Sequence, residues 1–332
     1  MSADTAQAMQ RRVGLGTWPT PLEPAPRLAA AIGLEPADLW VKRDDLTGLG
    51  GGGNKIRKLE WTVGAAMAEG ADTLVTTGAP QSNHARLTAA AAARLGLAAV
   101  LVFPGAPGGR GSGNLALDGL FGARVAWAGD VDANGLATAA SEVAARLEAQ
   151  GRRPALIPFG GSSSLGARGY AGCGREVLSQ APDVRTVVVA VGSGGTMAGL
   201  VAALGPERVL GVDTGALSEP APAVAAMATE TGGTAVTPAE LTLDDQVGEG
   251  YGTFTPAAAH ALSLAARTEG LVLDPVYTAR ALAGLVAAVR DGTIVPGRKT
   301  VFLHTGGLPG LFGHPTAITH AEQGLGEFPP AV

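Results

Sequence analysis

The stretch TVVVAVGSGGTMAG (residues 186–199) decides the fold class of this chain. An apolar, β-branched run leads into a glycine turn, and a helix-like segment follows. A buried strand, a tight glycine turn and a helix are typical of α/β proteins with parallel sheets. We therefore expect a strand over 186–191 and a helix over 195–204.

The turn between them also predicts chemistry. At such a junction, free backbone N–H groups and the positive end of the helix dipole suit an anion. No Gly-Lys-Ser/Thr follows, and Met197 stands where a dinucleotide fingerprint has its third glycine. A small phosphate group is therefore the expected ligand of Ser193, Gly194, Gly195 and Thr196. The alternative is a plain strand-to-helix turn.

Similar segments alternate along most of the chain, which supports the α/β class. We expect further strands over 39–42, 73–77, 98–103, 123–127, 208–213 and 300–303, and further helices over 55–69, 82–95, 134–150 and 275–290.

Composition limits the classes of function. Of the 332 residues, 46% are hydrophobic and 16% charged, which is enough for a sizeable core. The net charge of -5 argues against nucleic acid as the main partner, because a basic surface is needed to neutralise phosphates. Cys173 is the only cysteine, so an internal disulfide is excluded and a reducing compartment fits. Its small neighbours indicate a position packed on a helix.

We expect neither a secretion signal nor a membrane span. Arg11 and Arg12 are not followed by a continuous apolar core. The most apolar stretch, residues 85–103, is interrupted by Arg86 and Arg94, which a membrane span would exclude. The sequence therefore predicts a cytoplasmic protein.

Lys55 is the main catalytic candidate. It lies in GGGGNKIRKLE (residues 50–60), where four glycines precede it. Backbone without side chains lets a flat ligand approach closely, and a lysine amine held there can form a Schiff base with a carbonyl. This pattern predicts an enzyme that uses pyridoxal 5'-phosphate (PLP).

Polar residues also follow the expected strand 73–77, in the motif QSNH (residues 81–84). Ser82 or Asn83 could cap the next helix or contact a ligand, since an amide can bond a phenolate oxygen and a hydroxyl can relay a proton. His84 could equally be a packed core histidine or a catalyst.

Two of the three tyrosines lie in late polar motifs, Tyr251 in GEGYG (248–252) and Tyr277 in DPVYT (274–278). Each could serve the site or be a buried phenol with a hydrogen-bond partner. Asp44 and Asp45 could form a metal or acid site, but an ion-pair corner is favoured and no metal site is expected.

Taken together, these motifs resemble one family. In order they are KRDDLT (42–47), GGNKIRKLE (52–60), QSNH (81–84), GSGGT (192–196), GYG (250–252), DPVYT (274–278) and HTGG (304–307). This pattern resembles the D-cysteine desulfhydrase and 1-aminocyclopropane-1-carboxylate (ACC) deaminase family of PLP enzymes over residues 17–313. Such enzymes share the fold type II of the tryptophan synthase β subunit.

The resemblance implies two α/β domains with parallel or mixed sheets and PLP between them. Residues 1–53 and 162–332 would form the larger, PLP-binding domain and residues 54–161 the smaller inserted one. A homodimer is also implied, because family members are commonly dimers.

By the same resemblance, Lys55 carries the cofactor and moves the Cα proton of the substrate. Asn83 matches the residue that bonds the cofactor's ring oxygen, and Ser82 the residue beside the substrate carboxylate. Tyr251 and Tyr277 match two active-site tyrosines. The 193–196 turn matches the phosphate cradle.

Thr278 and Thr305, both counted among the cofactor contacts, bear on the substrate. ACC deaminases carry glutamate and leucine there. A carboxylate near the pyridine nitrogen makes a deep electron sink, whereas a neutral hydroxyl leaves a weaker one that suffices to eliminate sulfide. The small amino acid implied is D-cysteine, converted with water to pyruvate, hydrogen sulfide and ammonia.

Three alternatives stay open. L-cysteate sulfo-lyases share the framework, and residues 162–164 differ from the usual family pattern on the substrate side. An ACC deaminase is the second alternative. A PLP-binding carrier or regulator without turnover is the third, although such a protein would not need Lys55, Ser82 and the two tyrosines together.

Overall fold

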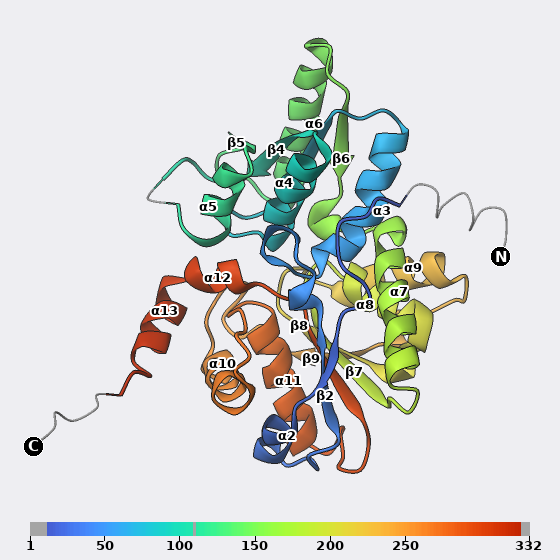
Figure 1. Cartoon of the computed structure of the whole chain (residues 1–332). Helices are drawn as coiled ribbons and strands as arrows, with labels where there is room; N and C mark the ends of the chain where they lie inside the picture. The colour runs from blue at the N-terminus through green and yellow to red at the C-terminus, as the bar shows by residue number, and fades with distance from the viewer. Residues whose placement is uncertain (1–11, 109–110, 327–332) are drawn as a thin grey trace, which may run out of the picture.

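A computed structural model describes residues 12–108 and 111–326 as two sheets flanked by helices (Figure 1). The strands are β1 (Leu22–Pro24), β2 (Leu39–Arg43), β3 (Thr73–Thr77), β4 (Ala98–Phe103), β5 (Arg124–Trp127), β6 (Pro154–Ile157), β7 (Thr186–Val191), β8 (Val209–Asp213), β9 (Thr242–Asp245) and β10 (Thr300–His304). The helices are α2 (Pro26–Ile32), α3 (Lys55–Ala68), α4 (Asn83–Leu95), α5 (Gly113–Leu120), α6 (Ala133–Ala149), α7 (Ser164–Gln180), α8 (Gly195–Leu204), α9 (Pro220–Gly232), α10 (Pro256–Glu269), α11 (Thr278–Arg290), α12 (Leu308–Phe312) and α13 (Pro315–Glu322).

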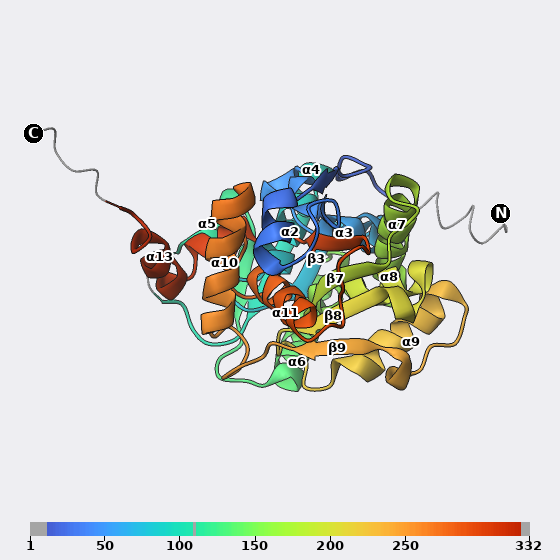
Figure 2. The same ribbon diagram turned by 90° about the horizontal axis from the view of Figure 1, so that it is seen from below.

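The larger sheet has the strand order β1-β2-β10-β7-β8-β9, and its strands run parallel except for β1. Helices α2, α10 and α11 cover one face and α7, α8 and α9 the other (Figure 2). Along β7, Val188 packs in the hydrophobic core under α2, α10 and α11. Val187 and Val189 pack in the core under α7, α8 and α9. The strand is therefore buried on both faces, which explains its unbroken apolar run.

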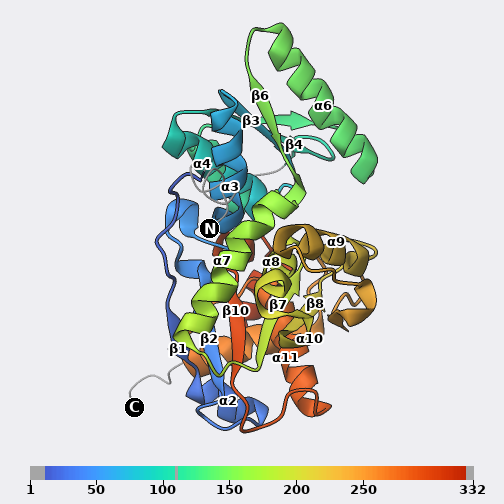
Figure 3. The same cartoon turned by 90° about the vertical axis from the view of Figure 1, so that its right-hand side faces the viewer.

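The smaller sheet has the order β5-β4-β3-β6 and is entirely parallel. Figure 3 shows α6 on one side of it and α3 and α4 on the other. Val75 and Val100 pack toward α6, whereas Leu74 and Leu101 pack in the core formed with α3 and α4. The predicted α/β class with parallel and mixed sheets is confirmed.

The two sheets divide the chain by residue number. All strands of the smaller sheet lie between Thr73 and Ile157, and all strands of the larger sheet lie outside that range. The domain limits at 53/54 and 161/162 remain a prediction.

One predicted helix begins later than expected. The sequence predicts it from residue 275, but α11 begins at Thr278. The Asp274 carboxylate accepts hydrogen bonds from the backbone N–H groups of Val276 and Tyr277 at 3.0 and 2.9 Å, and of Thr278 at 2.8 Å. These bonds hold residues 275–277 as a turn, so the Asp274 carboxylate delays the start of the helix, whose N-cap is Tyr277.

Two further expectations concern α7 and the membrane. Cys173 is buried within α7, as its small neighbours predicted. Within residues 12–108 and 111–326, no helix combines the length and the hydropathy that a membrane crossing requires. Arg11 lies outside the described residues.

Candidate active site

A cavity lies where the carboxyl ends of strands from both sheets meet. Nine of the predicted site residues line it: Lys55, Ser82, Asn83, Ser193, Gly194, Thr196, Tyr251, Tyr277 and Thr305. They follow β3, β7 and β10 or come from neighbouring loops and helix ends. In open α/β sheets, ligands bind at this edge.

Lys55 is the first residue of α3 and is half-buried. The glycines before it are required, because a Cβ on Gly52, whose φ is +73°, would lie 1.9 Å from the carbonyl oxygen of Asp45. Burial lowers the pKa of Lys55 to about 8, although Lys58 and Asp274 act in the opposite direction. An unusually large fraction of this amine is therefore uncharged, and nucleophilic, near neutral pH.

The glycine turn forms the start of α8. Gly194 is its N-cap with φ of +82°, and the Gly195 N–H donates to Ser162 Oγ at 3.2 Å. Ser162 Oγ lies 2.7 Å from Ser193 Oγ and accepts from Lys58 Nζ at 3.0 Å. A Cβ on Gly195 would lie 2.6 Å from Ser162 Oγ, so a larger residue would fill this space.

Lys58 lines the cavity, and the sequence interpretation missed it. Ser162, which belongs to the segment 162–164 that departs from the family pattern, bonds to Lys58 but is not among the lining residues. Lys58 is buried, and burial followed by the charge of Lys55 lowers its pKa well below the ordinary value. An anion beside it would favour the protonated amine. The spacing of Lys55 and Lys58, three residues apart on one helix, could have indicated their common face. The contact with Ser162 could not have been found this way.

Ser82 caps α4, because its Oγ accepts the Ala85 N–H at 3.2 Å, and it also lines the cavity. Asn83 is the first residue of that helix. His84 is buried with Nε2 2.9 Å from Thr76 Oγ1, and burial lowers its pKa well below the ordinary value. His84 also lines the cavity, so the structure shows a buried histidine at the edge of the site, with a lowered pKa that favours its neutral form.

Tyr251 and Tyr277 lie together, with 2.6 Å between their phenol oxygens. Burial, followed by the other phenol, raises the pKa of Tyr277 well above its ordinary value. Arg280 of α11 is buried behind them and donates to the carbonyl oxygens of Thr214 and Gly250 at 2.8 and 2.9 Å, and of Thr253 at 2.5 Å. The loop that carries Tyr251 is therefore held by α11.

Two predicted residues, Gly195 and Thr278, are not among the lining residues. Thr278 is fully buried and its hydroxyl donates to Asp274 Oδ1 at 2.7 Å. Thr305 does line the cavity, and its carbonyl oxygen accepts from the Asn54 N–H at 3.0 Å. Among the described lining residues, none carries a carboxylate.

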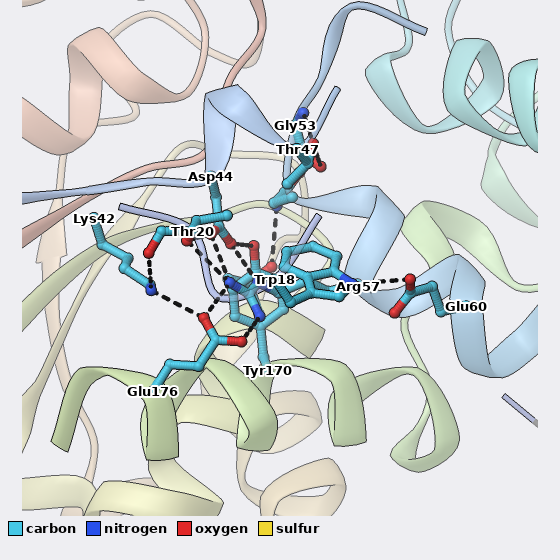
Figure 4. Close-up of polar contacts among 12 residues, drawn as sticks. Trp18, Thr20, Lys42, Asp44, Thr47, Gly53, Arg57, Glu60, Tyr170 and Glu176 are labelled. Carbon is cyan, nitrogen blue, oxygen red and sulfur yellow. Dashed lines mark hydrogen bonds and ion pairs between the residues drawn. The ribbon is translucent and has the colours of Figure 1, made fainter. Parts of the chain in front are cut away.

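Asp44 and Asp45 lie in ion pairs, as the favoured interpretation predicted. Asp44 Oδ2 accepts from Arg57 Nε at 2.7 Å and from the Tyr170 hydroxyl at 2.5 Å (Figure 4). Arg57 Nη1 also donates to Glu176 Oε1 at 2.8 Å. Asp45 pairs with Arg43 at 2.8 Å. This network joins α3 to α7 beside the glycine loop that precedes Lys55.

The fold and the cavity together define an α/β protein in which a lysine and a glycine turn at the start of a helix line one cavity. The family described as "Pyridoxal-phosphate dependent enzyme" matches residues 13–306. A D-cysteine desulfhydrase of Salmonella schwarzengrund (strain CVM19633) is 42% identical over 315 residues, covering 89% of this chain and 94% of the relative. A putative ACC deaminase of Pyrococcus horikoshii is 40% identical over 311 residues, covering 91% and 93%.

Two solved structures have folds similar to that of this chain. The crystal structure of an ACC deaminase homologue superposes with a TM-score of 0.85 at 37% identity, covering 96% of this chain and all of that one. A threonine deaminase from T.th., with a TM-score of 0.65 at 24% identity, shares the fold. The chain belongs to the pyridoxal-phosphate dependent enzyme family, within the group of D-cysteine desulfhydrases and ACC deaminases. Its cofactor is PLP.

Proposed function

We propose that this enzyme converts D-cysteine and water to pyruvate, hydrogen sulfide and ammonia. One observation carries the proposal: a lysine with a pKa of about 8 lies in a cavity whose described lining has no carboxylate. The chain is also 42% identical to a D-cysteine desulfhydrase along most of its length. Without a carboxylate beside it, the cofactor ring withdraws electrons less strongly. Such a ring suits the elimination of a good leaving group better than the opening of a cyclopropane ring.

Each set of side chains has a task in this proposal. The phosphate would lie at the start of α8 with Ser193, Gly194, Gly195 and Thr196, and Lys58 would supply the opposite charge. Asn83 would donate to the ring oxygen. When bound, PLP withdraws electrons from the Cα of an amino acid, so that the Cα–H bond becomes acidic.

Lys55 would hold the cofactor and then accept the Cα proton while the Cβ–S bond breaks and HS⁻ leaves. Ser82, at the start of α4, would bind the substrate carboxylate with the help of the helix dipole. Tyr251 and Tyr277 would donate hydrogen bonds to the leaving sulfur, because the raised pKa of both phenols keeps them protonated.

Thr278 bears on the substrate because its hydroxyl donates to Asp274. The nearby Asp274 carboxylate already accepts three backbone N–H groups and the Thr278 hydroxyl. Since both oxygens are engaged within the α11 cap, we propose that neither Asp274 nor Thr278 protonates the cofactor ring. This arrangement supports elimination over ACC deamination.

A panel of substrates tests the proposal. The PLP-loaded enzyme is given D-cysteine, L-cysteate and ACC separately, and 2-oxo acid, sulfide and sulfite are measured. We expect pyruvate and sulfide from D-cysteine alone. Sulfite from L-cysteate would identify a sulfo-lyase, and 2-oxo acid from ACC a deaminase.

A carrier would show bound PLP but no product from any of these amino acids. Lys55→Ala should lose both the yellow absorbance of bound PLP and sulfide release, by a factor of about 10² to 10⁴ or more. Lys299→Ala, which removes a lysine paired with Asp183 at the surface, is the matched control and should change neither. Sulfide release by Lys55→Ala at the wild-type rate would contradict the proposal.

We further propose a cytoplasmic homodimer whose chains each fold as a larger domain of residues 1–53 and 162–332 with residues 54–161 inserted. A single, buried cysteine supports a reducing compartment. Separate sheets on either side of these limits support the division. Light scattering during gel filtration tests the dimer: a mass near 33 kDa, the mass of one chain, would contradict it.

A further inference from the structure

Asn83 lies between the cavity and a buried polar cluster formed by Gln81, Arg86 and Asn114. Arg86 and Asn114 are fully buried, on α4 and α5 respectively. Because the two ends of an amide side chain differ in chemistry, the hydrogen bonds around it decide which end faces which neighbour.

The orientation of Asn114 follows from two neighbours whose chemistry is unambiguous. Arg86 Nε can only donate, and it lies 2.9 Å from the Asn114 oxygen, Oδ1. The Gln81 carbonyl oxygen can only accept, and it lies 2.9 Å from Asn114 Nδ2. Either contact alone would place the amide this way, and reversing the amide would leave the buried Arg86 Nε facing another donor.

The same Asn114 Nδ2 donates to Asn83 Oδ1 at 3.0 Å, and Arg86 Nη2 lies 3.5 Å from that oxygen. Both neighbours are donors, so the atom of Asn83 that faces them must be its oxygen. The amide nitrogen of Asn83 is then the end left for the cavity. Asn83 therefore presents a hydrogen-bond donor, its amide nitrogen, to the cavity.

We propose that Asn114, held by Arg86, is a positioning residue that fixes Asn83 with its amide nitrogen toward the cavity, so that the site accepts PLP with its ring oxygen as an acceptor. The inference rests on the proposed role of Asn83 in binding PLP and not on D-cysteine as the substrate. Arg86 also contacts the glycine loop before Lys55, because its Nη1 donates to the Gly52 carbonyl oxygen at 3.0 Å and to that of Gly50.

The test is Asn114→Asp, which keeps the shape and the acceptor for Arg86 but replaces the donor with a second acceptor. The Asn83 amide should then turn to donate to the new carboxylate and present its oxygen to the cavity. PLP affinity, measured by titration of the apoenzyme without substrate, should fall about tenfold to a hundredfold, the effect of losing a hydrogen bond to a charged group. The visible absorbance of bound PLP should shift in the same variant.

Asn83→Asp supplies the comparison, because two donors would hold one oxygen and leave the other facing the cavity. It should reproduce the affinity and spectral changes of Asn114→Asp, and the two losses should not add in the double variant. Asn134→Asp, at an exposed position on α6, is the matched control. Wild-type affinity and spectrum in folded Asn114→Asp, or losses that add, would overturn the proposal.

A measurement on the wild-type protein covers the case in which Asn114→Asp does not fold. With asparagine labelled with ¹⁵N, the side-chain amide signal of Asn83, assigned by its loss in Asn83→Asp, should move when PLP is added. The buried Asn114 amide should keep its slow hydrogen exchange before and after addition. An Asn83 amide signal unaffected by PLP would overturn the proposal. Since no substrate is present in any arm, a failed D-cysteine assay leaves these results interpretable.

Discussion

Tyr251 and Arg280 are connected through backbone: Arg280 of α11 donates to the carbonyl oxygens of Gly250 and Thr253, on either side of the Tyr251 turn. The same turn places the Tyr251 hydroxyl 2.6 Å from that of Tyr277. Helix α11, which packs against the larger sheet, thereby holds the turn that brings the Tyr251 phenol to the Tyr277 phenol.

Arg280→Met should therefore loosen the loop and misplace Tyr251. We expect kcat/KM for the amino-acid substrate to fall about tenfold to a hundredfold, because small displacements of a catalytic group have such effects. Arg280→Lys should recover only part of the rate, since an ammonium group lacks the planar fork.

Arg290→Met, at the exposed end of the same helix, is the control, and steady-state kinetics provide the measurement. Tyr251→Phe combined with Arg280→Met should lose little more than Tyr251→Phe alone; fully additive losses would contradict this prediction.

The pKa of Lys55 predicts how the apoenzyme captures PLP. Burial lowers that pKa to about 8, so the amine is mainly charged below this pH and mainly uncharged above it. The rate of covalent capture, followed by absorbance after rapid mixing, should rise with pH and level off near pH 8. N-acetyl-lysine in solution is the control and should keep rising toward its ordinary pKa of about 10.4. A capture rate that follows the free lysine would show that the cavity does not lower the pKa.

Asp118 predicts the dependence of stability on pH. Its carboxylate is buried and finds no hydrogen-bond partner among the described residues, and burial raises its pKa to about 7. The folded state therefore holds the proton more tightly than the unfolded state, and the stability this contributes is lost as pH rises from about 4 to about 7. Asp118→Asn should raise the free energy of unfolding by about 2–4 kcal/mol at pH 8 and by less at pH 5.

Urea unfolding at the two pH values provides this measurement. Asp130→Asn, at an exposed position, should leave the pH dependence unchanged. An equal effect of Asp118→Asn at both pH values would contradict the raised pKa.

The ion pair of Asp44 and Arg57 predicts how much the buried network beside α3 contributes to stability. Both side chains are buried, and the pair is 2.7 Å apart. Asp44→Ala should lower the free energy of unfolding by about 3–5 kcal/mol, because it leaves the guanidinium buried without its main partner. Asp183→Ala breaks the surface pair with Lys299 and should cost less than about 1 kcal/mol. Similar losses in the two variants would show that the buried network is not structurally important.

The sequence alone predicted the elements whose pattern is local. The strands 73–77, 98–103 and 186–191 and the helix 195–204 agree with β3, β4, β7 and α8, because β-branched runs and glycine turns act within a few residues. The bounds of α7 were not predicted, although Cys173 was expected on a helix. Strands β1, β6 and β9 and helices α2, α5, α9, α10, α12 and α13 were not predicted either. In α7, glycines Gly166, Gly169 and Gly174 weaken the helical pattern and are explained only by close packing, since a Cβ on Gly169 would lie 2.1 Å from the Arg57 carbonyl oxygen.

For the site, the sequence by itself predicted Lys55, the glycine turn and the polar motifs at strand ends as parts of one site, because each of these patterns depends on neighbours in the chain, and the structure brings them to one cavity. Only the tertiary structure decided that Lys58 Nζ meets Ser162 Oγ, 104 residues away, and that Asn114 faces Asn83. It also showed that Thr278 bonds to Asp274 beneath the cavity lining. Such contacts depend on how two sheets and their helices pack together, and packing brings together residues whose spacing along the chain carries no signal.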